Sequence, residues 1–305
     1  ASLAAERFAS LAELHIDALP ALGTAAARDG LSTAIGPNAR AARTQAAQER
    51  LEKGQQVCQD AIELSQAALT CPRKAPAWKL VASVANQCLS YDASVLSPDL
   101  VGPLGASLDS TVSAAAAAIL DLEHLPDASG TMLRLGRSIG GKDLRSAEMR
   151  CFTSYLSTAL RLAPTALHGP AAPTAQAQCR LCLDALHARG IRIDQNGLGH
   201  KTDDAKGVTP IDLSAVPAPL THRQQQWWRL IDESAAAALP AAAREHLDNC
   251  GGQEGSAYLM ANRRELGGKS LLDFEFRTYT LLGLALPVMK AGPCTHTSQD
   301  KFGKT

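Results

Sequence analysis

The sequence predicts an all-α protein made of stacked antiparallel helices. Hydrophobic residues make up 46% of the chain but aromatic residues only 4%, so much of the apolar content is alanine, in runs such as residues 114–118 and 235–238. Alanine has the highest helix propensity and presents little surface to a core, which favours many closely packed helices over a β-sandwich. Apolar residues also recur at spacings of three and four along much of the chain, as they do on the buried face of a helix.

In the first half of the chain, apolar spacing predicts helices over residues 4–19, 39–70, 78–89 and 108–125. The third of these has the most regular pattern, with apolar side chains at Trp78, Val81, Ala82, Ala85, Cys88 and Leu89. Proline interrupts regular structure, so Pro98 and Pro103 are expected to bracket a connector before the alanine-rich helix begins.

In the second half, the same spacing predicts helices over residues 149–163, 176–189, 222–239, 256–266 and 270–286. The last segment also fits a strand, because Leu272, Phe274 and Phe276 alternate with charged residues. Its length and its helical surroundings favour a helix. A proline- and alanine-rich stretch over residues 164–173 separates two of the predicted helices.

The length of 305 residues suits two ordinary domains or one elongated helical-repeat array. We expect an N-terminal helical region over residues 1–125, a C-terminal helical region over residues 126–290 and a flexible tail over residues 291–305. Residues 190–219 are predicted to form an irregular loop, because they contain several glycines and three prolines. Long irregular connections in a compact protein are often functional.

Charge and hydropathy narrow the classes of partner. Lys+Arg and Asp+Glu both number 30, whereas nucleic-acid-binding proteins usually carry a basic excess, so we expect no nucleic-acid partner. The longest strongly apolar run, residues 281–289, is far shorter than the about 20 residues that span a bilayer. Residues 1–20 carry charges throughout, unlike a secretory signal. The expectation is a soluble, non-transmembrane protein of a reducing intracellular compartment rather than a secreted one.

Two segments resemble an ankyrin repeat. Residues 204–214 read DAKGVTPIDLS and resemble the repeat opening D-x-x-G-x-T-P-L-H/D-x-A, while residues 182–194 read CLDALHARGIRID and resemble its second helix and loop. The resemblance covers about residues 176–214 and implies a recognition scaffold with a helix that starts at Thr209-Pro210. The chain departs from the family in an insertion over residues 196–202. The alternative is an ordinary loop before a helix start.

A zinc site is the first chemical possibility considered. Cys179-x-x-Cys182, together with His187 or with His246 and Cys250, could supply four ligands. Both cysteines of the pair lie within a helical pattern, however, whereas zinc-binding pairs usually lie on tight turns. We therefore predict buried structural thiols, no metal site and no cofactor.

The loop and the helix after it hold the candidate functional residues. His200, Asp203 and Asp204 could serve acid–base chemistry, although a solvated loop often has the same composition. Adjacent residues on a helix diverge by about 100°, so one of Trp227 and Trp228 can face the core while the other lies at a contact surface. These five residues are the candidates for partner binding, with no catalytic residue assigned.

Together these features favour a protein–protein interaction or scaffold protein without catalytic activity, whose partner is another protein. A helical enzyme that uses the loop over residues 190–219, with His200, Asp203 and Asp204, is the first alternative. An accessory subunit of a larger complex is the second, because alanine-rich helices with few aromatic anchors suit such a role.

The regular pattern around Trp78 generates a stability prediction. If Trp78 is a core residue, Trp78→Ala should lower the free energy of unfolding by roughly 3–5 kcal/mol, as truncation of large aromatic side chains in cores does. Chemical denaturation followed by circular dichroism measures the change. An unchanged denaturation midpoint would show that this face is exposed.

Overall fold

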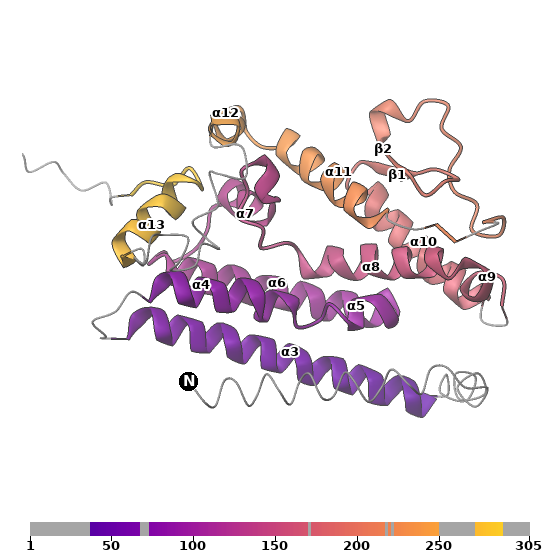
Figure 1. The fold of residues 1–305 in the computed structure, drawn as a ribbon, viewed down its shortest axis with the longest axis horizontal. Helices are drawn as coiled ribbons and strands as arrows, with labels where there is room; N and C mark the ends of the chain where they lie inside the picture. Colours follow the sequence, from indigo (N-terminus) through magenta and orange to yellow (C-terminus); the bar gives the residue numbers. More distant parts are fainter. Residues whose placement is uncertain are drawn as a thin grey trace, which may run out of the picture. The chain divides into compact units, whose positions relative to one another are not determined.

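Helices dominate the computed structural model, which describes residues 37–67, 73–169, 172–216, 219–220, 223–249 and 272–288 (Figure 1). The chain divides into two compact units, residues 1–48 and residues 49–305. The described part of the first unit is the beginning of one helix, and all other described elements belong to the second. The predicted boundary near residue 125 stays a prediction. The helices predicted over residues 4–19 and 256–266 and the predicted tail lie outside the described residues.

The elements follow one another as α3 (Pro37–Gln66), α4 (Lys74–Ser83), η2 (Ala85–Gln87), α5 (Asp92–Val95), α6 (Pro98–Ile119), α7 (Asp127–Arg134), η3 (Arg137–Ile139), α8 (Ala147–Arg161), α9 (Ala163–Ala166), α10 (Ala172–His187), β1 (Ile191–Ile193), β2 (Gly199–Lys201), η4 (Thr202–Asp204), α11 (Gln224–Ala237), α12 (Ala241–Asn249) and α13 (Asp273–Leu282). The predicted all-α class is thus confirmed, and the helices pack against one another within the second unit. A repeat organisation stays a prediction. In the described part of the chain, no helix is both long enough and apolar enough to cross a membrane.

Two apolar clusters fill the interior of the second unit. The first is built by α4, α6, α7, α12, α13 and the later part of α3, and it contains Trp78. The second is built by α8, α10, α11 and the segment around the strands, and it contains Trp227. Trp78 is fully buried as predicted, and its ring meets Phe276 of α13 edge-on at 5.9 Å. The helix predicted for the ambiguous segment around residue 276 is confirmed.

The predicted connector between Pro98 and Pro103 is wrong, because both prolines belong to α6. Pro98 occupies the first turn, where a missing N–H costs no hydrogen bond, and Pro103 lies in the second turn. Helix α6 packs closely against α8 at Gly105. Any larger residue there would place its Cβ only 2.7 Å from the backbone of Glu148, so glycine permits this close approach. The helix also ends at Ile119 rather than at residue 125.

Asp109 joins three helices. Its side chain on α6 accepts hydrogen bonds from Arg134 Nη1 of α7 (2.8 Å), from Ser146 Oγ (2.6 Å) and from the backbone N–H groups of Ala147 (2.7 Å) and Glu148 (3.3 Å). The last two are among the N–H groups that the start of α8 leaves without a partner inside the helix. A buried carboxylate at a helix start also interacts favourably with the helix dipole.

The segment predicted as an irregular loop, residues 190–219, contains a β-hairpin. Strands β1 and β2 pair antiparallel, with Ile193 opposite Gly199, and Gly197 takes a left-handed φ of 72° in the turn between them. The helix expected at Thr209-Pro210 is wrong, since no helix occurs in the described residues 205–216. Instead Ile211 N donates to Ile193 O (3.0 Å), so this segment runs beside the hairpin as a further extended strip.

The four hydrogen bonds of Asp109 predict a large stability loss on its removal. Asp109→Ala removes the carboxylate that accepts from Arg134 Nη1 and from the first backbone N–H groups of α8, although Arg134 Nη2 keeps its hydrogen bonds to the carbonyl oxygen of residue 109 and to Ser113. A largely buried charge thereby loses its partner, which should lower the free energy of unfolding by about 3–5 kcal/mol. Chemical denaturation measures the loss. Asp184→Ala, at an exposed position of α10, is the matched control and should change stability by less than about 0.5 kcal/mol. Equal effects of the two substitutions would contradict the joining role of Asp109.

Candidate functional site

Helix α11 and the β1–β2 hairpin together form the candidate site. Trp227 is fully buried, and its Nε1 donates a hydrogen bond to the carbonyl oxygen of Gly197 in the hairpin turn (3.0 Å). A Cβ at Gly199 would lie 2.7 Å from Leu230 and 3.1 Å from Trp227, so the glycine lets strand β2 approach the helix closely. Trp227 therefore holds the site together from inside rather than lining its surface.

Asp194 organises the hairpin. Its Oδ1 accepts hydrogen bonds from the N–H groups of Asn196 and Leu198 (both 2.8 Å), and its Oδ2 lies 3.0 Å from Nε2 of His200. Burial raises the pKa of Asp194, but the hydrogen bonds from His200 and from these two N–H groups outweigh it, so the pKa lies below its usual range. Asp194 is not among the residues predicted from the sequence to be functional, although an Asp two residues before Asn196-Gly197 is a typical turn-forming residue.

The three polar candidates of the loop are not brought together as an acid–base set. His200 lies on β2 and pairs with Asp194. Asp203 and Asp204 follow on η4, where both are exposed. The neighbouring Lys201 reaches α11 instead, where its Nζ forms an ion pair with Glu233 Oε2 (3.0 Å). The structure thus places His200 in the scaffold of the hairpin and the two aspartates on its solvent side.

Trp228 lies at the edge of the fold, half-buried, as the 100° divergence from Trp227 requires. The Arg145 guanidinium lies 4.9 Å from the centre of its ring, which is a cation–π contact. Arg145 Nη2 also forms an ion pair with Asp232 (3.1 Å), and Arg145 Nε forms one with Asp143 (2.8 Å). Asp143 takes a left-handed φ of 61°, which is uncommon outside glycine. This network ties α11 to the segment before α8.

Asp232 is the most perturbed carboxyl group of this network. Burial raises its pKa from 3.8 to about 6, against the lowering effects of Arg145 and of the backbone hydrogen bond from Gly136. Its side chain is only 5% exposed. The ionised form is therefore less favourable in the folded protein than in the unfolded chain.

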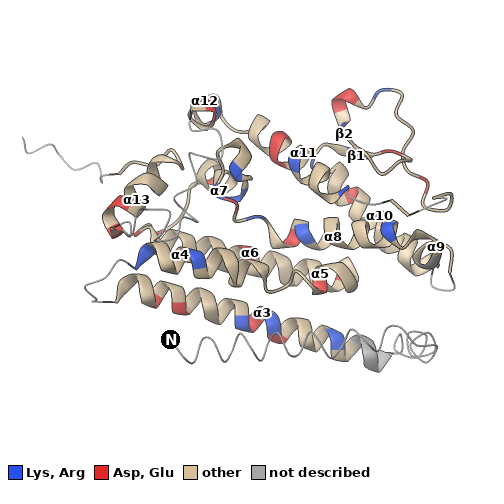
Figure 2. Ribbon diagram, in the orientation of Figure 1, with Lys and Arg blue, Asp and Glu red and all other residues tan. Residues whose placement is uncertain are grey.

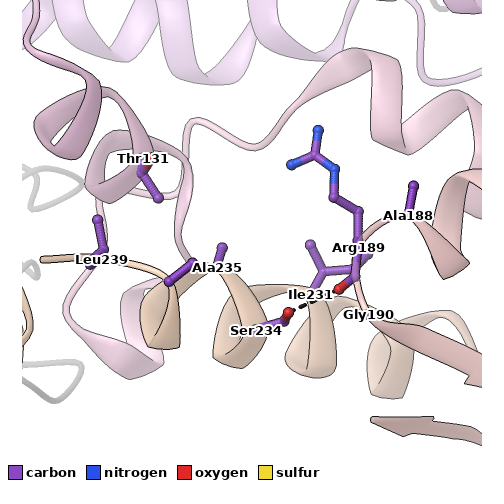
Figure 3. A pocket seen from close by; sticks show the side chains of 9 residues that line it. Thr131, Ala188, Arg189, Gly190, Ile231, Ser234, Ala235 and Leu239 are labelled. Atoms are coloured by element: carbon purple, nitrogen blue, oxygen red, sulfur yellow. Dashed lines mark hydrogen bonds between the residues drawn. The ribbon is translucent and has the colours of Figure 1, made fainter. Parts of the chain in front are cut away.

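A groove of about 390 Å³ runs along α11, between α7 and the end of α10. Its lining is mostly small or apolar, from Ala188, Ile231, Ala235, Ala238 and Leu239, with Thr131 of α7 and Ser234 of α11 beside them. Figure 3 shows the side chain of Arg189, which lines the groove, extending away from α11. Among the described residues that line the groove, Arg189 alone is charged.

The structure places the cysteines of the considered zinc site in the interior. Cys179 and Cys182 are fully buried on α10, and burial raises the pKa of both thiols, that of Cys179 to about 12. The thiolate, which is the metal-binding and nucleophilic form, is therefore strongly disfavoured. His187 is exposed on the same helix, and Cys250 lies outside the described residues. In the described ranges, no group of three or more His, Cys, Asp and Glu side chains is arranged to hold a metal ion.

The raised pKa of Asp232 predicts a pH-dependent stability difference. Because the folded-state pKa exceeds the unfolded value of 3.8, Asp232 favours folding at low pH, and this contribution is lost as pH rises through about 6. A rise from 3.8 to about 6 corresponds to about 3 kcal/mol, so wild-type stability relative to Asp232→Asn should fall by about that amount between pH 4 and pH 7. Urea denaturation at several pH values measures the difference. Parallel pH profiles of wild type and variant would contradict it, and Asp203→Asn serves as the exposed control.

Comparisons of this chain with protein-family models, with curated proteins and with solved structures find no match.

Proposed function

We propose that the protein is an interaction or scaffold protein without catalytic activity, and that it binds a partner protein through α11 and the hairpin beside it. The observation that carries this proposal is the groove of about 390 Å³ along α11, with its floor of small side chains. A preformed concave surface of this kind can accept a partner side chain without first ordering its own.

The surroundings of the groove support the same role. The hairpin is held to α11 by the Trp227 hydrogen bond, so the loop segment forms a fixed border rather than an independent arm. Trp228 is half-buried at the edge of the same helix, and tryptophan is enriched among residues that dominate binding energies. Asp203 and Asp204 form an exposed polar rim, where charges affect the association rate more than the affinity.

The charge distribution agrees with a protein partner. Figure 2 shows basic and acidic residues interspersed on the described helices, with both signs along α3, α8 and α11. A nucleic-acid-binding surface would instead gather basic residues along one face. The expectation of no nucleic-acid partner stays part of the proposal.

An exposed apolar face on α13 favours a second candidate function, that of an accessory subunit in a larger complex. Leu272, Phe274, Tyr279 and Leu282 are 48%, 66%, 51% and 48% exposed, whereas Phe276 of the same helix is fully buried against Trp78. Clustered exposed apolar side chains often mark a protein contact. A subunit that meets one neighbour at α11 and another at α13 would use both surfaces.

Site-specific photo-cross-linking tests the proposed function. A benzophenone amino acid replaces Ala238 in the groove and, as a matched control, the exposed Ala242 of α12. In extract of the source cells we expect a discrete protein adduct from position 238 and none from position 242. Trp228→Ala should lower the yield of that adduct at least several-fold, because it removes the half-buried aromatic side chain that lies one turn before Ile231 on the same helix.

Further variants distinguish the interaction proposal from the enzyme and accessory-subunit alternatives. The triple variant H200A/D203A/D204A should keep partner capture, and any turnover found by substrate screening should be unaffected by it. Loss of a turnover while capture survives would replace the interaction proposal with the enzyme alternative. Phe274→Ser with Tyr279→Ser should reduce the native mass of the complex only if the accessory-subunit candidate is correct.

A further inference from the structure

The groove along α11 carries an unused positive charge. The guanidinium of Arg189 is exposed at the groove and has no ion-pair or hydrogen-bond partner among the described residues. Nearby cations are committed elsewhere: Arg134 to Asp109, and Arg145 to Asp143 and Asp232. Arg189 is therefore the group near the groove that is available to an incoming anion.

The backbone around Arg189 is held in place, so the point from which its side chain extends is fixed before binding. Ser234 Oγ of α11 donates a hydrogen bond to the carbonyl oxygen of Arg189 (2.9 Å). Gly190 follows in a left-handed conformation (φ 76°), its N–H donates to His187 O, and its carbonyl accepts from Thr202 N (both 2.8 Å). The backbone N–H and carbonyl groups of Arg189 and Gly190 are thus hydrogen-bonded where the chain enters strand β1 at Ile191.

The floor beside Arg189 is apolar and made of short side chains. Ala235 lies on α11 with Ile231 one turn before it, and Ala238 and Leu239 directly follow the helix. Ala188 lines the groove from the chain segment after α10. Such a floor accepts an aliphatic side chain, while the exposed guanidinium suits a carboxylate, which arginine binds bidentately. A short peptide segment with an aliphatic side chain next to a carboxylate can therefore contact both the apolar floor and Arg189.

We propose that the groove binds a segment of the partner protein in which an aliphatic side chain stands next to an Asp or Glu. The aliphatic side chain occupies the floor over Ala235 and Ala238, and the carboxylate pairs with Arg189. This inference rests on the proposed interaction function and names the chemistry of the partner segment at the same site.

A peptide selection on the 305-residue protein tests this inference. Random 12-residue peptides displayed on phage are selected on the wild type and counter-selected on Ala238→Trp, whose side chain fills the groove. We expect enrichment of aliphatic residues adjacent to Asp or Glu. The best peptide is then synthesised with its carboxylate residue replaced by the corresponding amide residue, and binding is measured by fluorescence polarisation.

A double-mutant cycle gives the decisive comparison. Arg189→Gln and the amide peptide should each weaken binding about ten-fold, and the combination should weaken it little further, because both changes remove the same ion pair. Arg180→Gln, at an exposed position of α10, is the matched control and should leave affinity unchanged. Arg189→Glu should prefer a peptide with Lys in place of the acidic residue.

Two outcomes would overturn the inference. Selected peptides without acidic residues, or equal affinity of wild type and Arg189→Gln, would show that the charge plays no part in recognition. No selected peptide, together with a specific adduct from position 238 in the cross-linking experiment, would reject this occupant while leaving the interaction function intact. Absence of both the peptide and the adduct would reject the proposed function itself.

Discussion

The carboxylate of Asp109 is the interaction on which the arrangement of helices most depends. It lies in the middle of α6, and it binds Arg134 of α7 and the first backbone N–H groups of α8. The close approach of α6 to α8 at Gly105 brings those N–H groups within reach. Helix α8 in turn packs against α6 and α10, and it meets α11 as well. The carboxylate of Asp109 is therefore linked to the site through α8, together with the packing of α8 against its neighbours.

Helix α11 connects the two apolar clusters of the second unit. Trp227, Leu230 and Ile231 belong to the second cluster. Near the other end of the helix, Ala235 and Ala236 pack against the first cluster, to which Leu239 belongs. A helix held at both ends by separate cores presents its remaining surface as a rigid element. This is why the groove and the hairpin border can serve as a preformed binding surface, since sites on regular elements hold their geometry better than sites on loops.

Two separate sets of polar contacts connect α11 to its neighbours. On one side, Asp194, His200 and the Lys201–Glu233 pair fasten the hairpin. On the other, Asp232 is buried with Arg145 at the expense of its ionised form, whose pKa rises to about 6. A buried ion pair contributes less to stability than its geometry suggests, because both charges lose their hydration. What this pair supplies is a fixed connection between α11 and the segment that precedes α8.

The sequence by itself determined the helical class, the burial of Trp78, the helix around Phe276 and the expectation that one of Trp227 and Trp228 faces the core while the other does not. Each of these follows from local propensity or from the 100° step of a helix, which neighbouring residues alone set. Tertiary structure decided the inclusion of Pro103 in α6, the hairpin in place of an irregular loop, the pairing of His200 with Asp194 and the groove at Arg189. The extended course of Thr209-Pro210 was likewise decided there, by the hydrogen bond between Ile211 and Ile193. These features depend on close approaches between elements, on hydrogen bonds within a folded turn, or on a space enclosed by three segments. The spacing of residues along the chain carries no information about which distant surfaces meet.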